Sequence, residues 1–594
     1  FRCPFYPRNA GISAAPFYYV DIQVQRIEHW RWQKASEPLA QGEIIFELNG
    51  EGVEFQRTEN GFKYTFTSHT REPEGMDSRD VPVTSWVDAE AGESFGKSGI
   101  RLPFDLSTGD SPRLALVWSH WQDEAVLRAG EEAMEFKYTD LFGNREEMLS
   151  WASEERTRIL RRCDYLDSLL TDWSLGSSAS HMAALALHSF LLNTWWTLRK
   201  DGTDWFSAME GRCFFHSTVD VEYNDGLLYF ALWPELLEML LDEWEEYTND
   251  GEQVLGQEGK DTAFLSHDMG LGADVGEQAY DHGMEVEENS NYLLLLSAWT
   301  AFSGNIEKAT KKLPLCRKLA EFIVQADTTG NGVPDLGVAN TIDDASPAVQ
   351  YGREQVYLAV KAQAALWALA DLENRADIKE KNSQAERWRA FASKGIKTVE
   401  DQAWLGDHYA VTLTRTTEGL TDPWTGRELE PGELLGWDDY SIYTANGLLY
   451  LFLGGAKMPR WKTNRLAADI ENASRKTMGP YGSRHTSGPG SNVWFSQNIW
   501  RDFVAAYLGV DMLNNVERYW DYQVTTGDNW ESSLYYDTTE GNNLHHYPRG
   551  TTVLGMPMAA AGMRLNRLDQ DLTLRPVRNT LHVPLLPLAD WDRM

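Results

Sequence analysis

The sequence predicts an N-terminal antiparallel β-sandwich followed by an (α/α)6 helical toroid. Three observations predict this fold class. The length of 594 residues allows more than one large core. The first quarter of the chain alternates apolar and polar residues as strands do, and helical periodicity begins near residue 146. We therefore expect a β-sandwich domain over residues 1–145 and a toroid domain over residues 146–594.

The predicted sandwich rests on alternation and on turn dipeptides. Residues 43–69 alternate in the manner of strands and are interrupted by Asn49-Gly50 and Asn60-Gly61. Asn-Gly pairs supply the positive φ angles of tight hairpins, so we expect a hairpin at each. A further strand fits residues 113–118.

The predicted toroid rests on apolar residues repeating at three- and four-residue steps. About a dozen helices joined by long loops, without a fixed sequence period, favour paired helices in a ring over a solenoid. Long loops are often functional, and the candidate residues below lie in them. The expected helices are 146–170, 181–199, 226–246, 289–302, 306–325, 354–372, 384–404, 441–452, 461–477, 494–507, 516–524 and 553–563.

Composition favours an uncharged partner. The chain has 54 basic and 89 acidic residues, a net charge of −35, which repels nucleic acid and anionic membranes. The same acidity could serve solubility alone. The four cysteines show no zinc or disulfide pattern. We expect a soluble protein, since no apolar run or leader is evident; the first residue is Phe1, so cytoplasmic and secreted locations both stay open.

Two carboxylates among aromatic residues suggest sugar chemistry. Residues 205–225 contain Glu210 beside a glycine, and Asp220 ten positions later. A glycosidase needs one carboxylate at the anomeric carbon and a second carboxyl group that protonates the leaving oxygen, within an aromatic pocket. We expect Asp343, in residues 337–347, to be the second. Taken alone, each of these residues would more often be a surface or ion-paired carboxylate.

Five segments, in order between residues 150 and 565, carry a family resemblance. They are Glu210-Gly211 with residues 217–221, Ser-His-Asp-Met-Gly at 266–270, Thr-Ile-Asp at 341–343, residues 491–496, and Tyr-Pro-Arg-Gly at 547–550 with Glu540 nine positions before the arginine. In these segments the chain resembles the retaining β-glycosidases of glycoside hydrolase family 52, the β-xylosidases. It is more distantly similar to family 116, the β-glucosidase and glucosylceramidase group.

The resemblance implies site residues and an activity. Glu210 would be the nucleophile and Asp343 the general acid/base of an exo-acting retaining enzyme. The residues that would bind the terminal sugar are Asp220, His267, Asp268, Trp494, Glu540 and Arg549. Other interpretations stay open, because Asp220 could cap a helix and His267-Asp268 could form a turn. Ring closure must bring residues 210 and 343 together, and Arg212 is one candidate cation for the nucleophile.

A short loop is a candidate calcium site. Asp327, Asn331 and Asp335 alternate with glycines as calcium ligands do, and a similar loop in family 116 binds calcium. Thr329 and Asn331 replace carboxylates, so a plain turn is an equal interpretation. No other cofactor is required, and association into a homo-oligomer is left open.

Arg212-Cys213 and Ile342 depart from the family 52 pattern at positions that border the pocket, which affects the identity of the sugar more than the reaction. A β-xyloside is the first choice of substrate and a β-glucoside the second. Two other classes stay open: a toroid polysaccharide lyase, which the acidic charge disfavours, and a carbohydrate-binding protein without catalysis.

Overall fold

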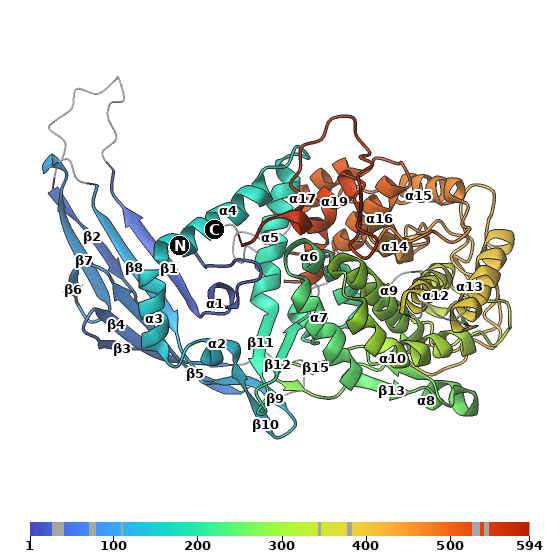
Figure 1. Ribbon diagram of the computed structural model, residues 1–594, viewed down its shortest axis with the longest axis horizontal. Coiled ribbons are helices and arrows are strands. Elements are labelled where there is room, and N and C mark those ends of the chain that lie inside the picture. The colour runs from blue at the N-terminus through green and yellow to red at the C-terminus, as the bar shows by residue number, and fades with distance from the viewer. Residues whose placement is uncertain are drawn as a thin grey trace. The chain divides into compact units, whose positions relative to one another are not determined.

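The computed structural model describes residues 1–25, 41–69, 79–108, 111–342, 346–376, 383–525, 535–539 and 546–592. The chain forms two compact units, which Figure 1 shows in ribbon form. The first comprises Phe1–Ser168, Trp196–Asp204 and Asp590–Met594, and the second comprises Leu169–Trp195 and Trp205–Ala589. The expected domain boundary at residue 145 stays a prediction.

The first unit contains the predicted β-sandwich. Its larger sheet has the order β1 (Phe17–Gln23), β8 (Arg113–His120), β5 (Asp80–Ala89), β4 (Gly61–His69) and β3 (Glu54–Arg57). Its smaller sheet has the order β2 (Gln41–Glu47), β7 (Gly99–Asp105) and β6 (Glu93–Phe95). Within both sheets the neighbouring strands are antiparallel. Residues from both sheets share one core: Val20, Ile44, Phe62, Val87, Ile100, Leu114 and Leu116.

Of the two hairpins predicted at Asn-Gly pairs, only the second is present, and without the expected positive φ at its glycine. Asn49-Gly50 joins β2 to β3, which belong to different sheets, so it is not the turn of a hairpin. A hairpin does follow β3, with Arg57 opposite Phe62, but Gly61 lies on strand β4 and has no positive φ. A Cβ at Gly61 would lie 1.9 Å from the carbonyl oxygen of Val87 on β5. Close approach of the backbones, and not turn geometry, requires glycine there.

Shorter elements complete the first unit. β9 (Glu124–Ala129) and β10 (Glu132–Phe136) form a hairpin, and β11 (Thr194–Leu198) pairs with β10. The helices are α1 (Ala10–Ser13), α2 (Lys137–Leu141), α3 (Arg145–Glu154) and α4 (Arg156–Thr171), the last of which continues into the second unit. Arg156 fixes α4 to the larger sheet through ion pairs with Asp21 at 2.7 Å and Glu90 at 3.0 Å.

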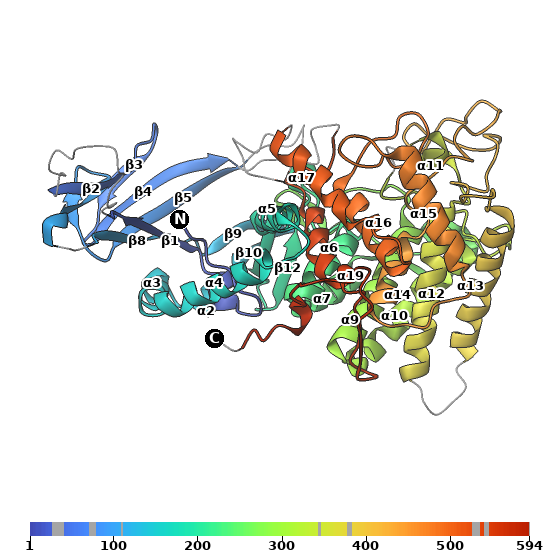
Figure 2. The ribbon, with the colours of Figure 1, turned by 90° about the horizontal axis from the view of Figure 1, so that it is seen from above.

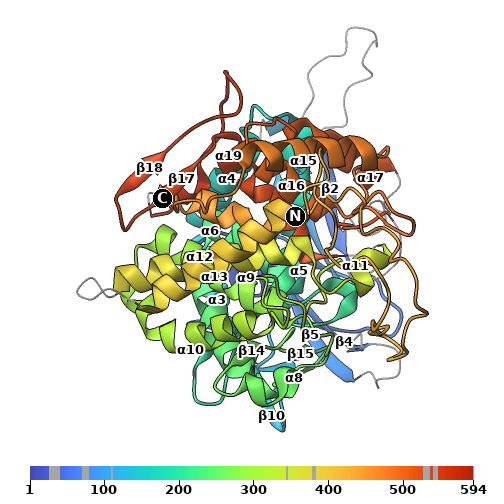
Figure 3. The same cartoon turned by 90° about the vertical axis from the view of Figure 1, so that its right-hand side faces the viewer.

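The second unit is a closed ring of helices. Six inner helical segments occur in the described residues: α6 (Val219–Leu232), α9 (Glu285–Ser303), α12 (Val356–Ala376), α14 (Leu449–Leu453) with the preceding η5 (Asn446–Leu448), α16 (Phe495–Tyr507), and η7 (Pro548–Gly555) with α19 (Met556–Ala560). Each contacts the next along the chain, and η7 contacts α6, so the ring closes. In Figure 3 the green and yellow helices α9 and α12 lie below the orange α16.

A second layer of helices covers the ring. Within the described residues it consists of α5 (Ser177–Asn193), α7 (Pro234–Glu243), α10 (Ile306–Gln325), α13 (Ser383–Gln402), α15 (Thr463–Thr477) and α17 (Val516–Thr525). α7, α10 and α13 contact α6, α9 and α12 respectively, and Figure 2 shows α12 beside α13. α5 contacts both η7 and α17. Inner and outer helices thus alternate along the chain, which confirms the predicted (α/α)6 toroid.

Five predicted helices differ from the structure. The helix expected over 146–170 is divided at Glu155 into α3 and α4. The helix expected over 553–563 begins within the 3-10 segment η7 and ends at Ala560. The helix expected over 181–199 ends at Asn193, because residues 194–198 form β11. The helix expected over 226–246 is two helices, since Pro234 begins α7 and cannot continue α6. The helix expected over 441–452 begins only at Asn446.

The remaining short elements connect the helices. They are β12 (Asp204–Ala208), η2 (Gly211–Cys213), η3 (Trp244–Tyr247), β13 (Thr248–Asp250), α8 (Glu252–Leu255), η4 (Gly256–Gly259), β14 (Ala263–Leu265), β15 (Gly270–Leu271), β16 (Asp274–Val275), α11 (Pro347–Tyr351), η6 (Leu513–Asn515), β17 (Arg564–Asn566), β18 (Asp571–Thr573) and η8 (Leu586–Leu588), with η1 (Leu106–Thr108) in the sandwich. Across the described residues, no helix has both the length and the apolar character to cross a membrane.

Candidate active site

Glu210 lies in a tightly folded loop at the end of β12. The strand ends two residues before it, and the 3-10 turn η2 follows directly. Phe214 and Ser217 in the same loop adopt φ angles of 65° and 38°. Left-handed backbone at residues other than glycine costs free energy and occurs preferentially at functional sites. The surrounding structure therefore determines the position of Glu210.

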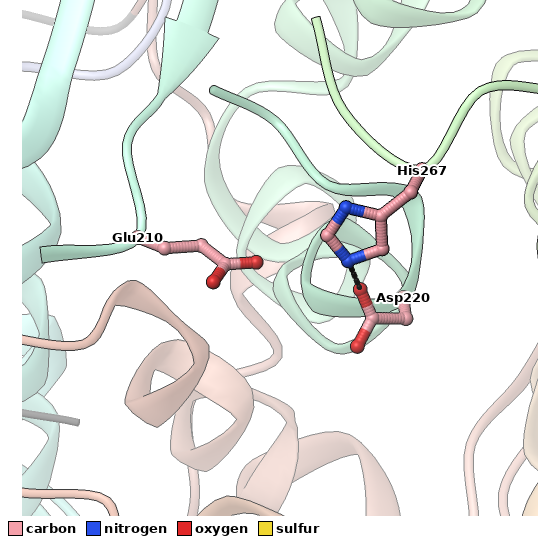
Figure 4. Close-up of side chains that lie close together, drawn as sticks. All are labelled: Glu210, Asp220 and His267. Atoms are coloured by element: carbon pink, nitrogen blue, oxygen red, sulfur yellow. Dashed lines mark ion pairs between the residues drawn. The ribbon is translucent and has the colours of Figure 1, made fainter. Parts of the chain in front are cut away.

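The carboxylate of Glu210 is buried and points at two other polar side chains. The residue is 4% exposed, and its carboxylate accepts hydrogen bonds from the hydroxyl groups of Thr218 and Tyr547, the latter at 3.0 Å. Figure 4 shows it directed toward Asp220 and His267. One nitrogen or oxygen atom from each of the three lies within 4.8 Å of the other two, and in the part of the chain that the structure describes no other trio of acidic, histidine or cysteine side chains does so.

Asp220 lies in the first turn of α6 and is not its N-cap, which is Thr218. One carboxylate oxygen, Oδ2, accepts a hydrogen bond from Oγ1 of Thr341 at 2.7 Å. The other, Oδ1, is 3.8 Å from Nε2 of His267. Asp220 therefore joins the loop that contains residue 341 to the loop that contains residue 267.

Asp268 orients His267. Its Oδ2 is 3.0 Å from Nδ1 of the imidazole, and the side chain is fully buried. Its two oxygens also accept hydrogen bonds from the backbone NH groups of Gly270, Ala279 and Tyr280, at 2.9 to 3.0 Å. Since both oxygens are engaged by the loop, the geometry favours a positioning role for Asp268 over direct contact with a sugar.

Arg549 is fully buried beside Asp220. Its Nη1 donates to Oγ1 of Thr341 at 2.8 Å and lies 3.8 Å from the carboxylate of Asp220. Its Nε donates to Oδ2 of Asp537 at 3.3 Å. The guanidinium carbon lies 4.4 Å from the ring centroid of Trp494, a cation–π contact. Five predicted site residues thus come together: Glu210, Asp220, His267, Trp494 and Arg549.

The predicted acid/base Asp343 and the predicted sugar-binding Glu540 lie outside the described residues. Thr341 and Ile342 are the last residues described before Asp343, and both are buried. Thr341 contacts Asp220 and Arg549 through its hydroxyl group. Thr341, two residues before Asp343 in the sequence, is therefore part of the site.

Burial sets the charge states at the site. Burial, and after it the charge of Asp220, raise the pKa of Glu210 to about 7, although His267, the Thr218 hydrogen bond and Arg549 act in the opposite direction. Burial by itself lowers the pKa of His267, but the hydrogen bond to Asp268 and the neighbouring carboxylates raise it to about 9. The cations that favour ionised Glu210 are therefore His267 and Arg549, whereas Arg212, which the sequence suggested, is exposed.

Three buried polar atoms at the site have no hydrogen-bond partner among the described residues. They are Oδ1 of Asp220, Nη2 of Arg549 and Nε1 of Trp494. Buried polar atoms are rarely left without partners, and each such atom costs free energy. One acceptor and two donors facing one site are suited to the hydroxyl groups of a ligand.

The buried ion pair between Glu287 and Lys361 holds the backbone of Thr341 in place. The backbone NH of Thr341 donates to Oε2 of Glu287 at 2.9 Å, and Nζ of Lys361 donates to Oε1 of the same carboxylate at 2.7 Å. Burial lowers the pKa of Lys361, although the Glu287 charge opposes this effect. The sequence singled out neither Glu287 nor Asp537 for the site, because each is one acidic residue among many.

The candidate calcium loop forms its own hydrogen bonds. Asp327 accepts from the backbone NH groups of Asn331 and Gly332 at 3.0 and 2.7 Å, and Asp335 accepts from the NH and hydroxyl groups of Thr328 at 2.7 and 2.6 Å. The Asn331 side-chain amide donates to Glu354 at 2.5 Å. These contacts account for the loop without an ion, and calcium binding stays a prediction from the sequence.

Comparison with known proteins supports the family resemblance. Residues 86–245 match the model of glycosyl hydrolase family 52, and residues 212–421 match that of the glutaminase A six helical-hairpin domain. The first match includes Glu210 and Asp220. The second names the architecture of six paired helices that the second unit shows. Fold and match together identify a glycoside hydrolase-like toroid protein, as the motifs indicated.

Solved structures show only distant similarity. A family 78 rhamnosidase of Bacillus sp. GL1 has 11% identity and a TM-score of 0.43, with 88% of this chain and 45% of that chain covered. A bacterial glucoamylase complexed with acarbose has 10% identity and a TM-score of 0.43 (87% and 76% covered), and a Klebsiella oxytoca rhamnosidase with rhamnose bound has 9% and 0.41 (92% and 86%). The chain thus spans less than half of the Bacillus rhamnosidase. No curated protein matches by sequence.

Proposed function

We propose that the protein is an exo-acting retaining β-glycosidase that hydrolyses terminal β-linked sugars, with β-xylosides as the first candidate substrates. The observation that carries the proposal is the buried Glu210 carboxylate beside Asp220 and His267. It is supported by the family 52 match over residues 86–245.

The chemistry would be a double displacement. Glu210 attacks the anomeric carbon while the bond from that carbon to the leaving oxygen breaks, and Asp343 gives its proton to that oxygen. Water then attacks the same carbon, Asp343 takes a proton from the water, and Glu210 leaves as a carboxylate. Two inversions at one carbon return the sugar with its original β configuration.

The neighbouring cations favour the ionised form of Glu210 that a nucleophile needs. Glu210 must be ionised to attack, and burial opposes this. Protonated His267 and Arg549 offset part of the effect, and hydrogen bonds from Thr218 and Tyr547 hold the carboxylate in place. The bound sugar would leave the hydrogen bonds from Thr218 and Tyr547 to Glu210 in place.

The terminal sugar would bind through the unpartnered polar atoms. Asp220 Oδ1 would accept from one hydroxyl group, and Arg549 Nη2 and Trp494 Nε1 would donate to others. Because these groups are fixed by Thr341, Asp537 and one another, they can distinguish equatorial from axial hydroxyl groups. The choice of a β-xyloside over a β-glucoside rests on the likeness of residues 266–270 and 547–550 to family 52.

A panel of aryl β-glycosides tests the substrate, with xyloside, glucoside, galactoside and glucuronide compared by kcat/KM. The Glu210→Ala variant should lose at least about 1,000-fold in kcat/KM. Added azide should then restore turnover and yield the α-glycosyl azide, because a small anion fits the vacated space. Glu307→Ala is the matched control, since the side chain of Glu307 is 85% exposed on α10. A correctly folded Glu210→Ala variant that azide does not rescue would count against the assignment.

A second candidate is hydrolysis of an amide, because the match to the glutaminase A hairpin domain covers residues 212–421, a longer segment than the family 52 match. Release of ammonia from L-glutamine without turnover of any glycoside would favour this candidate. Products that absorb ultraviolet light through a new double bond would instead indicate a lyase.

A further inference from the structure

Aromatic rings form a continuous series that starts at His267. The ring of Tyr280 lies 5.0 Å from that of His267, centroid to centroid, and His282 lies 5.1 Å from Tyr280. Trp424 is stacked on His282 at 4.2 Å with 22° between the ring planes. Phe215 contacts both His267 and Tyr280, at 5.6 and 5.5 Å. We name these five residues the aromatic path.

The aromatic path leads from the buried site to the surface of the second unit. His267 is 9% exposed, Tyr280 and His282 are half-buried, and Trp424 is 52% exposed. Few large aromatic side chains are this exposed in the described residues, and an exposed tryptophan stacked on a second ring is available to a ligand. The increase in exposure gives the path a direction, with Glu210 and Asp220 at its inner end.

Hydrogen bonds within its own loop hold Trp424 in position. Oδ1 of Asp422 accepts from the backbone NH groups of Trp424 at 2.8 Å and Thr425 at 3.1 Å. The NH of Asp422 donates to the carbonyl of Arg427 at 2.8 Å, next to a β-bridge between Thr421 and Glu428. The tryptophan is therefore fixed before any ligand arrives, which reduces the entropy cost of binding.

We propose that the aromatic path is the binding surface for the second sugar of a β-linked oligosaccharide, the ring attached to the terminal sugar that Glu210 attacks. This inference rests on the proposed function. When the terminal sugar occupies a buried pocket, the rest of the substrate must extend toward the opening, and the path extends in that direction. The apolar C–H faces of a pyranose ring stack well on flat aromatic side chains.

The net charge of the protein favours neutral sugars over anionic ones at the aromatic path. The chain has a net charge of −35, which disfavours uronates and other anionic sugars. The occupant is therefore a neutral pyranose. An aryl leaving group offers a similar flat apolar face, and the substrates below separate the two.

The test compares substrates with and without a second ring. Wild-type protein and the Trp424→Ala variant are assayed on the methyl β-glycoside, the aryl β-glycoside and the β-linked disaccharide of the sugar that the aryl panel selects. We expect Trp424→Ala to lower kcat/KM on the disaccharide by about 3- to 10-fold and to leave the methyl glycoside within about 2-fold. Trp424→Phe, which keeps an aromatic face, should recover most of the loss. Leu435→Ala is the matched control, since Leu435 is 61% exposed in the same connection between α13 and α14.

The outcomes separate this inference from the function on which it rests. An equal loss on the methyl glycoside and the disaccharide, or no loss on the disaccharide, overturns the second-sugar site and leaves the glycosidase proposal intact. A loss on the aryl glycoside alone assigns the path to aryl groups and also overturns it. Absence of wild-type turnover on every glycoside refutes the proposed function, and the second-sugar site with it.

Discussion

Replacing Glu210 by glutamine should change how stability depends on pH. Burial raises the pKa of Glu210 from 4.5 to about 7 in the folded protein. Below pH 4.5 the carboxyl group is protonated in both the folded and the unfolded chain, so the substitution has no effect through ionisation. As pH rises from 4.5 to 7, the unfolded chain ionises first and the wild type loses stability. The difference between the two pKa values corresponds to about 3 kcal/mol in the free energy of unfolding.

Glutamine has the same shape and does not ionise, so Glu210→Gln should gain stability relative to wild type between pH 5 and pH 8, by up to about 3 kcal/mol. The measurement is the free energy of urea unfolding of both proteins at pH 5, 6, 7 and 8. Glu307→Gln, at an exposed position, controls for the loss of one charge. If the curves for wild type and Glu210→Gln stay parallel across this range, Glu210 is not a buried carboxyl group with a raised pKa.

Three further predictions concern the neighbours of Glu210. Arg549→Met should destabilise the protein by about 3–5 kcal/mol, measured by urea unfolding, because it leaves the buried carboxylate of Asp537 without its cation and Asp220 with His267 alone; a loss below about 1 kcal/mol would contradict the ion pairing. Trp494→Phe keeps the ring over Arg549 but removes the Nε1 donor, so kcat/KM on the best glycoside should fall about 2- to 10-fold while stability changes little. Dialysis against EDTA should leave glycoside turnover unchanged, because a double displacement needs two carboxyl groups and no ion; loss of turnover that zinc restores would instead assign a metal to the trio of Glu210, Asp220 and His267, and loss that only calcium restores would favour the loop of Asp327, Asn331 and Asp335.

Two helices show where the apolar pattern predicts helix bounds and where it does not. α10 matches its predicted range at both ends, and it is a half-buried helix with one apolar face. Every residue of α6 is buried, so its first turns carry buried acidic and polar residues and no apolar stripe. The prediction therefore began at residue 226 and missed the turn that holds Asp220. A helix that is buried on all sides thus lacks the polar face that marks its first turn in the sequence.

The site was predictable where residues lie in short motifs. Asp220, His267 and Arg549 belong to segments that resemble a family, and the structure brings them to Glu210. Asp537 and Glu287 could not be recognised, because each is one acidic residue among many and no motif marks its contact with Arg549 or Lys361. The aromatic path is similar in this respect, since His282 and Trp424 are far apart in the sequence and stack in the fold.

The most direct test of the central claim, that Glu210 is the nucleophile, is to trap the glycosyl-enzyme. A 2-deoxy-2-fluoro β-glycoside with a good leaving group forms the ester and slows its hydrolysis, so the labelled peptide can be identified by mass spectrometry. We predict one sugar per chain, attached to the peptide that contains Glu210. A label on Asp220 or on any other carboxylate, or turnover that proceeds with inversion and leaves no label, would contradict the account.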